Sequence, residues 1–174
     1  MLSAVLLILA AAAVTVLTVL LRKSAHDAWT DALTGAGNRR MADRALFARR
    51  APAAVVLVDL DGLREINKRE GHAAGDELIR RATDALRDVA LAGDTVARVG
   101  GDELLLIAAP GHRDAEGLLL RAGTAMRAAG VAASIGASDV RGRADVHAAL
   151  ERADRRARAA KSDIKPSNDT KVDR

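Results

Sequence analysis

The chemistry that this chain could perform is concentrated in a turn that combines two glycines with two carboxylates. Residues 98–107, RVGGDELLLI, place Gly100 and Gly101 directly before Asp102 and Glu103, and an apolar strand follows. Glycine lets a backbone approach a phosphate closely, and adjacent carboxylates are ligands for hard divalent cations. The pattern therefore predicts a site for a metal ion and a phosphate. A hairpin turn whose acids are merely solvated is the alternative for such a short motif.

A second pair of carboxylates ends another apolar strand. Residues 55–61, VVLVDLD, carry Asp59 and Asp61 at the end of that strand. If the two strands pair, Asp59 converges with Asp102 and Glu103, a pattern that holds two divalent ions in nucleotidyl transfer. Asp61 has a second interpretation, because an acid at this point could cap the helix that follows.

Side chains suited to a base and to phosphates lie farther along the chain. The predicted loop 67–76 begins with Asn67, an amide donor and acceptor, and ends with Asp76, which can accept from the two adjacent N–H groups of guanine. Lys161 and Lys165 are four residues apart on or just past the last predicted helix, one face of which could neutralise phosphate. Helix capping by the first two residues, and a solvated or membrane-facing basic surface for the lysines, are the alternatives.

Composition narrows the chemistry further. The chain of 174 residues contains no cysteine, which excludes disulfides, thiol catalysis and cysteine-bound zinc. Its four histidines are scattered, so we expect any metal ion to be a hard one on oxygen ligands. With one tryptophan, one phenylalanine and no tyrosine, the chain offers no aromatic platform for stacking bases. We therefore expect no nucleic-acid partner, despite the formal charge of +4.

The first residues are apolar enough to suggest a membrane helix. Residues 1–21 carry no charge, and as a helix they would span roughly 30 Å, the thickness of a bilayer core. Arg22 and Lys23 follow directly, and the positive-inside rule would keep the following domain in the cytoplasm. We expect a single-pass anchor in the inner membrane over residues 1–22 and a linker, or a helix extension, over 23–30. A cleaved signal peptide is the competing interpretation.

Hydrophobic periodicity and turn residues predict alternating strands and helices after residue 30. The predicted strands are 53–60, 95–98, 104–108 and 131–137. The predicted helices are one that ends near residue 50, 62–69, 76–89, 113–129 and 145–161. This order predicts an α+β domain whose helices pack on one face of a mostly antiparallel sheet. The polar tail 166–174 is expected to be disordered.

Taken together, these segments resemble the GGDEF family of diguanylate cyclases over residues 28–166, with the domain itself at 31–165. The motifs that carry the resemblance are Asp31-Ala32-Leu33-Thr34, Asn38-Arg39-Arg40, Val58-Asp59-Leu60-Asp61, Asn67 with Gly71-His72 and Gly75-Asp76, Arg98-Val99-Gly100-Gly101-Asp102-Glu103-Leu104, Ser134-Ile135-Gly136, and Ala153-Asp154 with Lys161 and Lys165.

The resemblance implies a palm-like fold and the condensation of two GTP into cyclic di-GMP with release of pyrophosphate. Asp59, Asp102 and Glu103 would be the catalytic acids, and with the carbonyl of Leu60 they would bind two magnesium ions, with manganese as a substitute. Since each domain holds one GTP, catalysis would require a homodimer. With the apolar N-terminus, the chain is expected to be a membrane-anchored diguanylate cyclase.

The resemblance also implies the residues that would bind the substrate. Asn67 and Asp76 would read guanine, and Gly100 and Gly101 would let the chain approach the phosphates. The cations assigned to the substrate are Arg64, Lys161 and Lys165.

Several positions depart from the family pattern. Leu104 replaces a phenylalanine, Leu63-Arg64 replaces Phe-Lys, and Lys68 replaces an acid, while the last helix is altered at Arg156 and Arg158. These departures keep open a catalytically weak or inactive domain that binds GTP or a partner protein. A cyclase that makes a different cyclic nucleotide is a third possibility.

Overall fold

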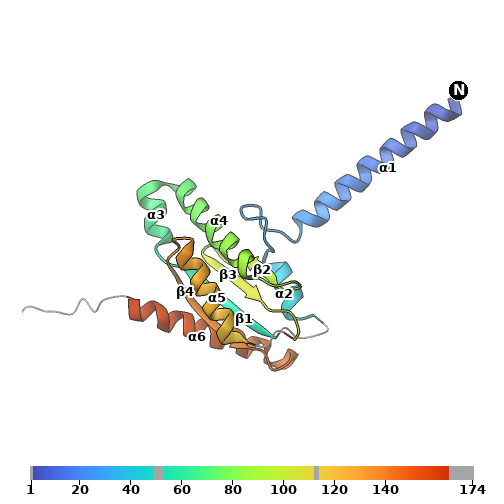
Figure 1. The fold of residues 1–174 in the computed structure, drawn as a ribbon. Coiled ribbons are helices and arrows are strands. Elements are labelled where there is room, and N and C mark those ends of the chain that lie inside the picture. The colour runs from blue at the N-terminus through green and yellow to red at the C-terminus, as the bar shows by residue number, and fades with distance from the viewer. Residues whose placement is uncertain (1, 49–52, 112–113, 165–174) are drawn as a thin grey trace, which may run out of the picture.

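A four-stranded antiparallel sheet forms the centre of the molecule (Figure 1). The computed structural model describes residues 2–48, 53–111 and 114–164, without the side chains of residues 2–9, 22, 25, 163 and 164. The strands, in the order β2-β3-β1-β4 across the sheet, are β1 (Ala54–Leu60), β2 (Thr95–Arg98), β3 (Glu103–Ile107) and β4 (Ala133–Asp139). The four predicted strands and the α+β class are therefore confirmed.

Helices cover both faces of this sheet, which corrects the prediction that they pack on one face (Figure 1). Val56 and Val58 of β1 face a core shared with α4 and α5, whereas Val55 faces a core shared with α2 and α6. A strand that is apolar at consecutive positions is suited to burial on both sides. The helices around the sheet, with the short 3-10 helix η1, are α2 (Arg39–Leu46), α3 (Leu63–Glu70), α4 (His72–Val89), α5 (Ala115–Ala128), η1 (Arg143–Asp145) and α6 (Val146–Ile164).

The N-terminal helix α1 (Leu2–Asp27) extends away from the sheet (Figure 1). It includes residues 23–27, so this part of the predicted linker extends the helix. Within the described part of the chain, no helix is long and apolar enough to span a membrane. The predicted anchor over residues 1–22 is therefore not supported.

The predicted loop 67–76 is helical on both sides of a single glycine. Gly71 ends α3 and precedes α4, with a φ of 87° that suits a residue without a side chain. Its backbone N–H donates to the carbonyl of Asn67 at 3.0 Å. The two helices are therefore joined almost without a loop, and α4 begins at His72 rather than at Asp76.

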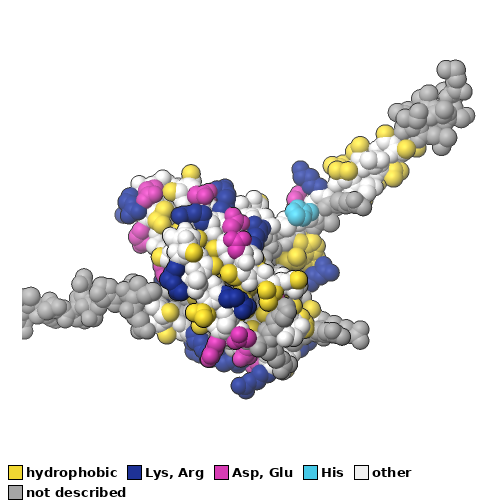
Figure 2. Space-filling model, viewed as in Figure 1, with side chains coloured by type: hydrophobic (Ala, Val, Ile, Leu, Met, Phe, Trp, Pro, Cys, Tyr) yellow, Lys and Arg dark blue, Asp and Glu magenta, His cyan; other side chains and the backbone are white. Residues whose placement is uncertain are grey.

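Charges on the outer surface of α4 pair along the helix. Arg80 contacts Glu77 at 3.5 Å, and Arg87 contacts Asp84 at 3.0 Å, both with the spacing of three residues. Figure 2 shows basic and acidic side chains interspersed on the visible face of the domain. On this face the positive net charge is therefore not gathered in one patch.

The predicted helix end at residues 49 and 50, the predicted disordered tail 166–174, and Lys165 lie outside the described residues.

Candidate active site

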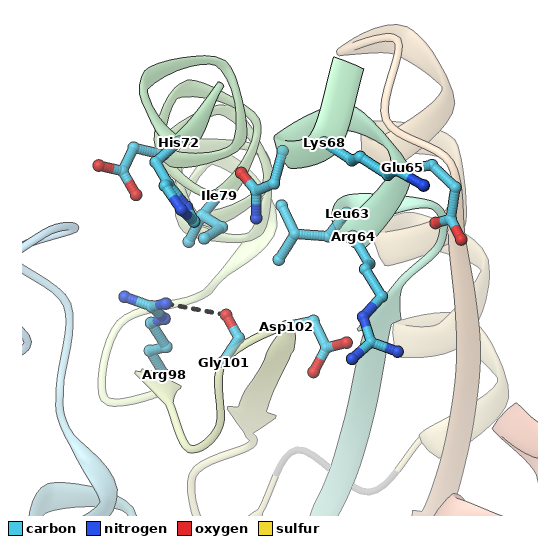
Figure 3. A pocket seen from close by; sticks show the side chains of 11 residues that line it. Leu63, Arg64, Glu65, Lys68, His72, Ile79, Arg98, Gly101 and Asp102 are labelled. Carbon is cyan, nitrogen blue, oxygen red and sulfur yellow. Dashed lines mark hydrogen bonds between the residues drawn. The ribbon is translucent and has the colours of Figure 1, made fainter. Parts of the chain in front are cut away.

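A large cleft lies between the α3–α4 pair and the turn that precedes β3 (Figure 3). Its volume of about 970 Å³ is in the range of sites that bind small molecules. Asn67 and Asp76 line it from the two helices, and Gly101 and Asp102 line it from the turn. The structure therefore brings the predicted base-reading residues and part of the predicted phosphate and metal site into one cavity.

A smaller cleft of about 420 Å³ adjoins the large one. Asp61 and Lys161 line the smaller cleft, while Arg64 and Asp102 line both. Figure 3 shows the Arg64 guanidinium and the Asp102 carboxylate pointing toward one another from α3 and the turn. Arg64, predicted to bind substrate, thus lies where the two cavities meet.

Gly100 and Gly101 suit their positions in the turn for different structural reasons. Neither adopts a positive φ, so the left-handed conformation typical of glycine hairpin turns is not used here. A Cβ at Gly100 would lie 2.5 Å from a carboxylate oxygen of Glu103, so Gly100 makes room for that side chain. A Cβ at Gly101 would meet no described atom within 4 Å. Gly101 therefore leaves open space on the wall of the large cleft, as the predicted approach of a phosphate requires.

Arg98 holds this turn in place, a role that the sequence analysis missed. Its guanidinium donates to the carbonyls of Gly100 at 3.2 Å and Gly101 at 2.8 Å, the latter drawn in Figure 3. The same group contacts the carboxylate of Asp31 at 3.5 Å. Arg39 adds a hydrogen bond to the carbonyl of Val99. The Asp-Ala-Leu-Thr and Asn-Arg-Arg motifs therefore support the turn from behind.

Lys161 contacts the carboxylates at the end of β1. Its ammonium donates to Asp59 at 2.7 Å and lies 3.4 Å from Asp61. The hydrogen bond to Asp59 is the main cause of a raised pKa of Lys161, partly opposed by burial, and Asp61 adds to the rise. Ser134 donates to both carboxylate oxygens of Asp61, at 3.1 and 3.0 Å. Asp61 thus joins this ion-pair group, and the helix after it is capped by Gly62.

The three predicted catalytic acids lie at the neighbouring ends of β1 and β3. Asp59 and Glu103 are cross-strand partners, whereas Asp102 precedes β3 and lines both clefts. The Leu60 N–H donates to the Asp102 carbonyl at 2.9 Å, which ties the two strand ends together. Among the described residues, no group of three or more acidic or histidine side chains is arranged to hold a metal ion. The two strands therefore pair as predicted and bring the three residues to neighbouring strand ends, although the described side chains are not arranged around a metal position.

The donor atoms at these strand ends nevertheless fit a divalent cation. An ammonium already lies between Asp59 and Asp61, so this position attracts positive charge. All the candidate ligands are oxygen atoms, which magnesium and manganese prefer. A metal ion would have to replace the Lys161 ammonium at Asp59.

Asn67 is the most unusual polar residue of the large cleft. Its Oδ1 atom is buried and has no hydrogen-bond partner among the described residues. A buried polar atom without a partner is costly, and such atoms are rare in folded proteins. This unpaired oxygen lies against Gly75 of α4, so the rest of the Asn67 side chain is the part that lines the cleft.

Comparison with known proteins identifies a domain with this architecture. The family described as "Diguanylate cyclase, GGDEF domain" matches residues 28–166 of the chain. The chain is 35% identical over 92 residues to the diguanylate cyclase DosC of Escherichia coli, covering 48% of the chain and 20% of DosC. It is 40% identical over 93 residues to the diguanylate cyclase TpbB of Pseudomonas aeruginosa, covering 49% of the chain and 21% of TpbB.

A solved structure shares the fold over a longer stretch. The coiled coil and GGDEF domain of DgcB from Caulobacter crescentus, in complex with c-di-GMP, superposes with a TM-score of 0.72 at 22% identity. The match covers 90% of this chain and 92% of that one. The chain itself spans only about a fifth of the length of the two cyclases above.

Proposed function

Since the chain belongs to the GGDEF domain family of diguanylate cyclases, we propose that it condenses two GTP into cyclic di-GMP with release of pyrophosphate. The observation that supports this most is the large cleft, which is lined by Asn67 and Asp76 and by the open backbone of Gly101. The Asn67 amide would hydrogen-bond to the guanine edge. Asp76 would accept from the guanine N1–H and N2–H groups, which adenine does not offer.

The acids at the strand ends would serve the reacting groups. Asp59, Asp102, Glu103 and the Leu60 carbonyl are the residues that would hold magnesium, which when bound neutralises triphosphate charge and makes the 3′-hydroxyl easier to deprotonate. Asp102 lines both clefts, and its carboxylate would accept the proton of the attacking hydroxyl. The bond from the 3′-oxygen to the α-phosphorus forms as the bond to pyrophosphate breaks.

The cations around the clefts would balance the charge of the triphosphate. Arg64 lines both clefts, so its guanidinium would meet a phosphate bound in either of them. Lys161 is released from Asp59 if a metal ion takes its place, and its ammonium is then free to bind phosphate. Each domain has one such pair of clefts, so the reaction of two GTP requires two domains that face one another as a homodimer.

A non-catalytic module that binds GTP is the second candidate. The ion pair between Lys161 and Asp59, and the basic Lys68 in the large cleft, favour it over the cyclase. In that case, GTP would bind through Asn67 and Asp76 without turnover.

The deciding experiment is incubation of the chain with GTP and Mg²⁺, followed by identification of the product by mass spectrometry and chromatography. Cyclic di-GMP formed at a rate that rises with the square of protein concentration at high dilution would support a dimeric cyclase. GTP binding without any product would support the second candidate, a non-catalytic module that binds GTP. ATP in place of GTP is the matched control, and equal use of both would contradict guanine recognition.

The cellular location stays a prediction from the sequence. We propose that the protein lies at the inner membrane. This proposal rests only on the apolar sequence of residues 1–21, since no helix in the described part of the chain could span a membrane. Separation of membrane and supernatant fractions after a wash at high salt would test it, and protein found only in the supernatant would contradict it.

A further inference from the structure

The first turn of α4 contains a glycine that its backbone does not require. Gly75 is buried, lies inside the helix, and does not have a positive φ. In such a position alanine is the more favourable residue for the helix. The reason for a glycine must therefore come from packing.

The space that a side chain would fill at Gly75 holds the amide of Asn67. A Cβ at this position would lie 2.0 Å from Asn67 Oδ1 and 2.8 Å from Cγ, both far inside contact distance. A methyl carbon of Leu63 would be 3.1 Å away. An alanine at position 75 would therefore push the Asn67 amide out of its present place.

The backbone of Asn67 is held in the last turn of α3, where its carbonyl accepts from the Gly71 N–H at 3.0 Å. The place of the amide therefore depends on the packing of its side chain. Asn67 and Leu63 both approach the empty position at Gly75, and both line the large cleft.

We propose that Gly75 is a specificity-determining positioning residue, whose missing side chain seats the Asn67 amide so that the cleft accepts guanine and rejects adenine. This inference rests on the proposed GTP site. Gly75 would not touch the ligand, and it would act only through Asn67. The neighbouring Asp76 would keep its place in either case, because its side chain projects from a different side of the helix.

The test compares the binding of GTP and ATP to the full chain by calorimetry, in wild type, Gly75→Ala, Asn67→Ala and the double variant. Loss of one well-placed buried hydrogen bond corresponds to about a tenfold loss of affinity. We expect Gly75→Ala to weaken GTP by about that factor and to leave ATP unchanged. In the double variant, the alanine at position 75 should have no further effect on the GTP to ATP ratio.

The matched control is Gly123→Ala in α5. There a Cβ would meet only the flexible Arg127 guanidinium at 3.3 Å and a methyl of Ile135 at 3.9 Å. This variant should keep the wild-type ratio. A Gly75→Ala protein that folds and retains the full preference for GTP would overturn the inference. The inference would also be wrong if Gly75→Ala lowered the preference by the same factor in the Asn67→Ala background as in wild type.

Stability gives a second readout if Gly75→Ala does not fold. Restored folding in the double variant would support the proposed role of Gly75, because it would show that the alanine at position 75 clashes with Asn67. A double variant that also fails to fold would place the clash elsewhere and overturn the inference. If wild type already binds GTP and ATP equally, the proposed guanine site fails, which is distinct from failure at Gly75 alone.

Discussion

The two ends of α6 hold the same sheet through basic side chains, but they differ in how completely those side chains are satisfied. Near its start, Arg152 donates to Asp145 at 2.9 and 3.1 Å, to Ser138 at 2.9 Å and to the Asp139 carbonyl at 3.0 Å. Asp145 also accepts from the Arg141 N–H at 2.9 Å. One guanidinium thus meets one carboxylate and two neutral oxygens, so charge is balanced. We call these contacts of Arg152 the closed clamp, and this end of α6 the closed end.

The other end carries an excess of negative charge. Lys161 contacts two carboxylates, Asp59 and Asp61, and Glu103 is paired across the strand from Asp59. With Asp102, these acids outnumber the two cations of the smaller cleft, Lys161 and Arg64, so a further cation would be attracted there. The α6 helix thus makes two kinds of contact with the sheet: the Arg152 contact only holds the helix in place, whereas a ligand could displace the Lys161 contact.

The strongest way to break both contacts together is a substitution at Gly136, which lies between them in β4. A Cβ there would be 1.9 Å from the Ala153 carbonyl and 2.6 Å from the Ala157 nitrogen, so the backbone of α6 would have to move. We expect Gly136→Ala to lower the free energy of unfolding by about 3 kcal/mol or to prevent folding. Urea denaturation measures this, with Gly123→Ala as the control. Equal stability of Gly136→Ala and wild type would contradict the close helix–sheet contact.

The Lys161 end of α6, where a ligand could displace the ion pair, is tested by activity rather than stability. Asp59→Asn keeps the size of the side chain but removes a charge that would bind a metal ion. We expect turnover to fall by at least about a hundredfold while the melting temperature changes little, because the side chain lies at a half-exposed strand end. Asp154→Asn, which alters an exposed pair with Arg158 on the same helix, is the control and should keep its activity. Normal product formation by Asp59→Asn would exclude this carboxylate from the metal site.

The contrast between the two ends also shows what sequence can and cannot predict. The strands were found from runs of apolar residues, and the cleft residues Asn67 and Asp76 from their side-chain chemistry. By contrast, Lys161 and Asp59 are separated by 102 positions, and Arg98 and Asp31 by 67. Local periodicity reports how a segment meets the core, whereas such contacts depend on how distant segments pack. The same limit applies to Gly75 in α4, because the side chain that it makes room for, Asn67, lies on α3.

The closed end is tested by stability rather than activity. Arg152→Met removes the guanidinium but keeps a long apolar side chain over the sheet. We expect a lower midpoint of urea denaturation, since the Asp145 carboxylate loses its charged partner and keeps only the Arg141 N–H, while Ser138 loses a donor. Turnover for each folded molecule should stay as in wild type, because none of these groups lines the clefts. A loss of turnover with unchanged stability would mean that the two ends are coupled.

The smallest effect is the pH dependence of the closed clamp. The hydrogen bonds from Arg152 and from the Arg141 backbone lower the pKa of Asp145 from 3.8 to about 2. A lowered pKa in the folded state stabilises the protein above the ordinary value, and this contribution is lost as the pH falls through about 2. The stability advantage of wild type over Arg152→Met should therefore be constant above pH 4 and should shrink below it. Carboxyl NMR shifts measure the titration directly: we expect the Asp145 midpoint near 2 in wild type and closer to 3.8 in Arg152→Met. A wild-type midpoint near 3.8 would show that the guanidinium does not hold the carboxylate in solution, and the distinction between the two ends of α6 would then be lost.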